Sequence, residues 1–235
     1  MEIYSYLCYQ RTTNTLFEAN NTIIHKSHIT INIYNMNEQT TLFSIGHGQK
    51  PLEEFYEELI SFGIQFVIDV RSTPFSKWAP QYNQKEIANY LKSHDIVYAY
   101  MGNIIGGRPI NESCYDSEGH FDYEKMAQEP SFKEGIQRLV NANEKRFNVA
   151  VMCSESDPSL CHRSKLIGRE LYENYNINMK HIVSAGVFID EVHVIMELTK
   201  GQWTPPDQSL FPCPMPYFKS KKIYKEETEE VFAYD

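Results

Sequence analysis

The chain has 235 residues, 42% of them hydrophobic and 23% charged, a composition typical of a folded globular protein. Its 22 lysines and arginines against 31 acidic residues give a formal net charge of −9, which argues against non-specific binding to nucleic acid or to an anionic membrane. No apolar run reaches the roughly 18 residues that span a bilayer, and no secretory signal opens the chain, so we expect a cytoplasmic protein with no membrane partner.

Residues 1–40 differ from the rest of the chain, because they are rich in Asn, Thr, Ile and Tyr. They include a strand-like stretch, HITINIYN, and Met36 would make a natural start for the remainder of the chain. Two interpretations stay open. The segment is an atypical arm, either disordered or the product of an upstream start, as termini often are. Alternatively, it adds a strand at the edge of the domain.

From residue 41 onward, short apolar strands alternate with amphipathic helices. The first half of this region predicts strands at 41–45, 65–70 and 96–101. Helices are predicted between them at 51–63 and 84–95, the first of them bounded by Pro51 and Gly63. Residues 71–83 are rich in Pro, Ser and Asn and predict a loop.

The second half opens with a glycine-rich stretch, residues 102–123, for which we expect a long loop that is functional or mobile. The elements predicted after it are helices at 123–128, 131–144, 161–176 and 187–198, and strands at 148–153 and 178–183. From residue 201 a proline-rich tail becomes highly charged, and we expect an irregular wrap followed by a helix or disorder.

This alternation predicts an α/β fold, a Rossmann-like open and mainly parallel sheet of about five strands with helices on both faces. We assign the domain to residues 41–200, preceded by the arm at 1–40 and followed by the tail at 201–235. In a parallel sheet all carboxyl ends of the strands meet at one edge, where ligands usually bind. Residues that could react with or bind a ligand lie at the ends of the predicted strands or after them, at that edge: His47, Asp69, Arg71, Gly107, Arg108, Cys153, Glu155, Cys161, His162 and Arg163.

The stretch VMCSESDPSLCHR, residues 151–163, is the most informative of these. Cys161 and His162 are expected near the start of a helix, where the helix dipole lowers the pKa of a thiol and free N–H groups bind anions. Arg163 could hold a phosphate or carboxylate through two hydrogen bonds. The alternative is structural: Cys161 faces the core and Arg163 packs its stem over the surface.

Cys153 ends a predicted strand and is a candidate nucleophile, with His47 or His162 as its base and Glu155 as a further acid or base. It is equally compatible with a small core residue. Cys153, Cys161 and His162 could also bind zinc, yet their spacing is not a familiar zinc pattern, so we predict no metal site. The cofactor stays open.

The remaining candidates bind rather than react. Arg71 is a candidate anion ligand, whereas Asp69 fits either a ligand contact or a structural role in its loop. Gly107 allows close approach of the backbone to a ligand or a mobile lid. Neither a dinucleotide fingerprint nor a Walker-type phosphate loop occurs in the chain.

Four segments in order, FSIGHG, VIDVRSTPFS, MGNIIGGRP and VMCSESDPSLCHR, resemble the family called domain of unknown function 488. The resemblance spans about residues 41–182 and implies a compact α/β domain, with the candidate residues above at motif positions. It implies no reaction. Gly48 stands where the family tends to have Ser, and residues 103–105 depart from the usual loop. The DVR strand end also resembles rhodaneses, but SESDPS lacks the glycine that a tight anion loop needs.

Three functions are compatible with these residues, as hypotheses. The first is an enzyme, of the hydrolase or transferase class, acting on a small anionic substrate for which a nucleotide is one candidate. The second is a non-catalytic module that senses the same ligand and reports to a partner. The third is a redox or metal site built on Cys153 and Cys161.

Overall fold

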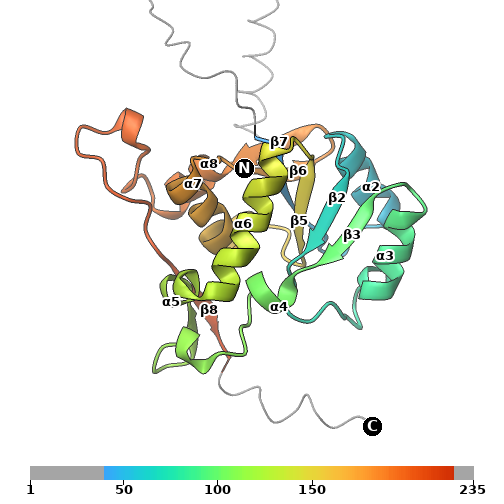
Figure 1. Cartoon of the computed structure of the whole chain (residues 1–235), viewed down its shortest axis with the longest axis horizontal. Coiled ribbons are helices and arrows are strands. Elements are labelled where there is room, and N and C mark those ends of the chain that lie inside the picture. The colour runs from blue at the N-terminus through green and yellow to red at the C-terminus, as the bar shows by residue number, and fades with distance from the viewer. Residues whose placement is uncertain (1–39, 225–235) are drawn as a thin grey trace, which may run out of the picture. The chain divides into compact units, whose positions relative to one another are not determined.

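The computed structural model describes residues 40–224 (Figure 1). The predictions for the N-terminal arm, including its strand, and for residues 225–235 of the tail lie outside the described part of the chain. Among residues 40–224, no helix has both the length and the apolar character needed to cross a membrane.

The core of the domain is a six-stranded sheet in the order β3-β2-β5-β1-β6-β7. Its first five members run parallel to their neighbours, and β7 is antiparallel at the edge. The predicted α/β class, with an open and mainly parallel sheet, is therefore confirmed. The strand bounds are β1 Leu42–Gly46, β2 Phe66–Asp69, β3 Val97–Tyr100, β5 Val149–Cys153, β6 Lys180–Ser184 and β7 Val187–Asp190.

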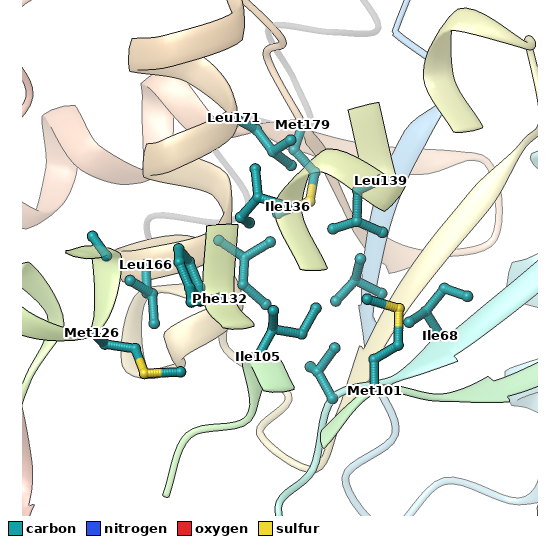
Figure 2. Packing of buried hydrophobic residues seen from close by; sticks show 14 of the residues in the cluster. Ile68, Met101, Ile105, Met126, Phe132, Ile136, Leu139, Leu166, Leu171 and Met179 are labelled. Carbon is teal, nitrogen blue, oxygen red and sulfur yellow. The ribbon is translucent and has the colours of Figure 1, made fainter. Parts of the chain in front are cut away.

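Helices cover both faces of this sheet (Figure 1). On one face, α2 (Leu52–Ile60) and α3 (Gln84–Lys92) bury their apolar sides against the strands. On the other, α5 (Tyr123–Gln128), α6 (Pro130–Glu144) and α7 (Arg169–Tyr175) form the larger core. Figure 2 shows this packing, in which Phe132, Ile136 and Leu139 of α6 lie beside Ile105 and Leu171.

Three predictions for individual segments were wrong. Residues 102–123 are not one loop, because they contain α4 (Gly102–Ile105) and the short strand β4 (His120–Asp122). β4 pairs with β8 (Lys219–Ile223), so this part of the tail forms a strand where we expected a helix or disorder. These two strands are far apart along the chain, and local sequence patterns do not register such a pairing.

The helix predicted at 187–198 is half strand. Residues Val187–Asp190 form β7, and only Glu191–Leu198 form helix α8. Gly186 has φ +71° and lets the chain reverse between β6 and β7. The hydrogen bonds to β6 then outweigh the helical periodicity of the apolar residues. The helix predicted at 161–176 also begins differently, as a π-helix at Arg163–Gly168 that continues into α7.

The strand order places a crevice between β1 and β5. From β1 the chain passes through α2 to β2 on one side, and from β5 it passes through the π-helix and α7 to β6 on the other. These two connections cross opposite faces of the sheet. Where the connections from two neighbouring strands leave to opposite faces of the sheet, a crevice opens at the carboxyl ends, the usual ligand site of open α/β sheets.

Candidate active site

A pocket of about 570 Å³ opens at this crevice. It is lined by residues that follow β1, β2 and β5, by the loop after α4, and by the tail. Of the predicted site residues, it brings together His47, Arg71, Gly107, Cys153, Glu155, Cys161 and His162. Asp69 and Arg163 are not on its surface and lie buried in the protein.

Arg71 is held in place by Asp69. The Asp69 carboxylate accepts from the backbone N–H, Nε and Nη2 of Arg71 at 3.0, 2.9 and 2.6 Å, and from the Tyr98 hydroxyl at 2.7 Å. The carbonyl of Tyr82 accepts a further bond from Nη2. This arrangement leaves Nη1 as the part of the guanidinium directed to other partners. Asp69 is therefore a positioning residue, which is the structural role the sequence had left open.

His47 is one of those partners. Its Nε2 lies 3.1 Å from Nη1 of Arg71, and its Nδ1 lies 2.8 Å from the carbonyl oxygen of Gly48. Because an arginine can only donate, Nε2 accepts and Nδ1 carries the proton. The ring also stacks on Tyr82 with centroids 4.2 Å apart. Burial, together with the charge of Arg71, lowers the pKa of His47 to about 4, so the ring is neutral at pH 7. Because the lone pair of Nε2 already accepts a hydrogen bond from Arg71, His47 fits a positioning role better than the role of a base.

The floor of the pocket holds two thiols and an imidazole. One ligating atom from each of Cys153, Cys161 and His162 lies within 4.8 Å of the others, and all three side chains are buried. Sγ of Cys161 lies 3.6 Å from Nδ1 of His162. Hydrogen bonds from Cys161 and His162, with the positive charge of Arg163, hold the pKa of Cys153 well below its usual value. The pKa of Cys161 is raised by burial and by Cys153.

The family model described as Domain of unknown function DUF488 matches residues 51–169, just over half of the chain. The chain belongs to the DUF488 family. No curated protein and no solved structure matches the chain. Every predicted site residue of this DUF488 domain except His47 falls inside the matched span.

Arg163 lies beneath the pocket of the DUF488 domain, at 1% exposure. Its Nη2 donates to the carbonyl of Ser156 at 2.9 Å, whereas Nε and Nη1 have no hydrogen-bond partner within residues 40–224. A side chain at Gly46 would come within 2.8 Å of Nη1, so this glycine makes room for the guanidinium. Arg163 is thus neither a surface residue nor a direct wall of the pocket. Its positive charge lies close enough to Cys153 to lower the pKa of that thiol.

A buried chain of hydrogen bonds anchors the π-helix that carries Arg163. Oε2 of Glu191 lies 2.6 Å from Nε2 of His181, and Nδ1 of that histidine lies 2.6 Å from Oγ of Ser44. The hydroxyl of Ser164 donates to Oε1 of Glu191 at 3.1 Å. Gly168 faces the same carboxylate, because a Cβ there would lie 2.3 Å from Oε2. The network ties β1, β6 and α8 to the π-helix, a form of helix often found at functional sites.

Gly107 packs directly on the imidazole of His162. A Cβ at this position would lie 2.9 Å from Nδ1 and 3.3 Å from Cε1. The glycine thus permits the predicted close approach of the backbone, although its neighbour in the structure is His162. Glu155 is exposed on the pocket wall, where its carboxylate can reach a bound molecule.

The mouth of the pocket is aromatic and basic. Trp78 is 87% exposed and Phe75 is 62% exposed, and both line the pocket. The lining residues that sequence reasoning missed include Tyr123, Lys222 and Tyr224. Lys222 and Tyr224 come from β8 and the residue after it, and no local motif could reveal that this tail returns to the site.

The same three atoms at the pocket floor could hold a metal ion. Two cysteine sulfurs and one histidine nitrogen match the ligand set of some catalytic zinc sites, which keep a fourth position open. The distance of 3.6 Å between Cys161 Sγ and His162 Nδ1 is of the size that tetrahedral zinc bonds produce. The prediction of no metal site remains a prediction.

Proposed function

We propose that this DUF488 domain is a thiol-dependent enzyme, of the hydrolase or transferase class, acting on a small anionic substrate. The proposal is carried by one observation. Cys153 lies at the pocket floor, and the sulfur of Cys161 and a ring nitrogen of His162 lie within 4.8 Å of its own sulfur; these neighbours, with Arg163, lower its pKa. The lowered pKa favours the thiolate, which is the form in which cysteine acts as a nucleophile.

The surrounding groups supply the other roles. The guanidinium of Arg71, fixed by Asp69 and His47, presents Nη1 to the pocket as an anion ligand. Nε2 of His162 is buried without a hydrogen-bond partner among the described residues, and the ring lines the pocket, so His162 is the candidate acid or base for a substrate or leaving group. In this mechanism Cys153 attacks an electrophilic centre next to the bound anion.

The mouth of the pocket supports a ligand with a planar part. Exposed aromatic side chains such as Trp78 and Phe75 stack well on nucleobases. Arg108 and Lys222 add positive charge at the same opening. The chain as a whole has a net charge of −9 and repels anions. Cations gathered at one opening therefore make this site more favourable for an anion than the rest of the surface. A nucleotide combines both features.

Thermal unfolding in the presence of small ligands tests the proposal. We expect a nucleoside monophosphate to raise the unfolding temperature more than inorganic phosphate or the nucleoside alone, because a ligand that binds only the native state stabilises it. Arg71→Gln should remove the shift. Arg138→Gln, which changes an exposed arginine on α6, is the matched control and should keep it.

Turnover separates an enzyme from a sensing module. The stabilising ligand, incubated with the protein, should be converted by the wild type and recovered unchanged with Cys153→Ser. A ligand that binds through Arg71 but is recovered intact from the wild type would favour the sensing module. If the protein is folded and no anion raises its unfolding temperature, the proposal is contradicted.

A further inference from the structure

The two thiols at the pocket floor form a pair. Cys153 ends β5, and Cys161 follows the short 3-10 helix Pro158–Leu160. Their sulfurs lie within 4.8 Å of each other, both side chains line the pocket, and both cysteines are free. A disulfide requires a separation of about 2.0 Å. The two sulfurs can therefore meet through a movement of less than about 3 Å.

The two thiols differ in their surroundings. Cys153 is 6% exposed and Cys161 is 2% exposed, so Cys153 is the more accessible to a molecule in the pocket. Sγ of Cys161 lies 3.6 Å from Nδ1 of His162. A reactive thiol beside a second, resolving thiol is typical of redox-sensitive sites.

We propose that Cys153 and Cys161 close into a reversible disulfide when a hydroperoxide enters the pocket, so that the site carries a redox switch. This goes beyond the proposed enzymatic function, and it needs no substrate to be tested. The disulfide removes the Cys153 nucleophile while it lasts. The switch therefore turns the site off under oxidation and back on when a dithiol reduces the bond.

The reaction balances in two steps. In the first, the Cys153 thiolate attacks one oxygen of hydrogen peroxide, the O–O bond breaks, and hydroxide leaves with a sulfenic acid formed on Cys153. In the second, the sulfur of Cys161 attacks the Cys153 sulfur and the S–O bond breaks. The departing hydroxide and the proton from Cys161 form water. The hydroxide from the first step takes up the proton that Cys153 released on ionising and becomes the second water, so that overall two thiols lose two electrons and the peroxide is reduced to two waters.

Another buried cysteine provides an internal control. Cys114 is fully buried, and its Sγ lies 3.9 Å from the sulfur of Met126. Burial raises its pKa. Cys114 is also absent from the pocket lining. It should therefore remain reduced under conditions that oxidise the pair.

Mass spectrometry of the full chain tests the switch directly. The protein is first treated with a chelator, then with a few equivalents of hydrogen peroxide, and is digested without reduction. We expect a peptide that links Cys153 to Cys161 and that disappears on addition of dithiothreitol. In Cys161→Ser, dimedone should instead trap a sulfenic acid on Cys153. Cys114→Ser should form the linked peptide as the wild type does.

The results that overturn the proposal are distinct from those that overturn the enzyme. Direct conversion of wild-type Cys153 to sulfinic acid, without a linked peptide, rejects the switch but leaves a reactive thiolate for catalysis. A disulfide-linked Cys153 peptide that still forms in Cys161→Ser would show that another cysteine is the partner, and it rejects the switch as well. A Cys153 that reacts with neither peroxide nor alkylating agents rejects both proposals.

Discussion

Arg71 donates a hydrogen bond from Nη1 to Nε2 of His47 across 3.1 Å. A guanidinium cannot accept, so this bond exists only while His47 is neutral. The pair therefore connects the ligand-binding arginine to the protonation state of a buried histidine. Protonation of His47 would place two like charges side by side and remove the acceptor that orients Arg71.

This relationship predicts a pH dependence of stability. Because the pKa of His47 is about 4 in the folded protein against 6.5 as the ordinary value, the unfolded chain binds this proton first as pH falls. Stability should decline between pH 6.5 and pH 4, by about 3 kcal/mol from this group. Denaturant unfolding at successive pH values measures it.

His47→Gln is the matched variant for that measurement. Its amide oxygen can accept from Arg71 but does not titrate in this range. The variant should show a shallower decline in stability between pH 6.5 and pH 4 than the wild type. Identical pH profiles for the two proteins would contradict the assignment of a neutral, buried His47.

Removing the carboxylate of Asp69 should be severely destabilising. Asp69 is fully buried and accepts three hydrogen bonds from Arg71. Asp69→Ala leaves the arginine charge buried without its partner, which typically costs about 3–5 kcal/mol. Urea unfolding checks this value. The exposed pair of Glu134 and Arg138 on α6 is the comparison, and Glu134→Ala should change stability by less than about 1 kcal/mol.

Gly107→Ala should disturb His162 in particular. The added methyl group would lie 2.9 Å from Nδ1, so the imidazole or the loop must move. We expect a loss of about 1–3 kcal/mol in stability together with slower alkylation of Cys153. Gly186→Ala is the control, because no atom lies within 4 Å of its Cβ position although φ is +71°. That variant should lose stability through backbone strain alone, and equal effects of both variants on Cys153 would refute this role of Gly107.

The buried network around Glu191 should matter for both stability and the site. Glu191→Ala removes the partner of His181 and Ser164 from a fully buried position. The expected loss is about 3–5 kcal/mol. Ser164→Ala, which deletes one hydrogen bond, should cost about 1 kcal/mol. A small effect of Glu191→Ala in denaturant unfolding would show that the π-helix does not depend on this anchor.

Much of the fold could be predicted because the strands of the sheet are short apolar runs between helices with clear ends. The convergence of His47, Arg71 and Cys153 also followed from topology, since parallel strands share one carboxyl edge. The sequence could not show which of these residues line the pocket and which are buried away from it. Asp69 ends β2 and Arg163 begins the π-helix after β5, close to the pocket residues in the sequence, yet both are buried and neither lines the pocket.

Long-range pairing accounts for the other errors. β4 and β8 are joined only in the folded chain, which brings Lys222 and Tyr224 to the pocket from the tail. β7 is apolar with a pattern that also fits a helix, and its pairing with β6 decides the outcome. A turn at Ala185–Gly186, in the sequence SAG, was the available local signal for that hairpin.

The central claim, a reactive Cys153 thiolate among cations, is tested most directly by the pH dependence of its alkylation. Reduced protein is reacted with iodoacetamide at successive pH values, and peptide mapping follows Cys153 alone. The account predicts a midpoint well below the value of about 8.5 for a free cysteine, and a higher midpoint in Arg163→Gln. A midpoint at or above about 8.5 in the wild type would contradict the account.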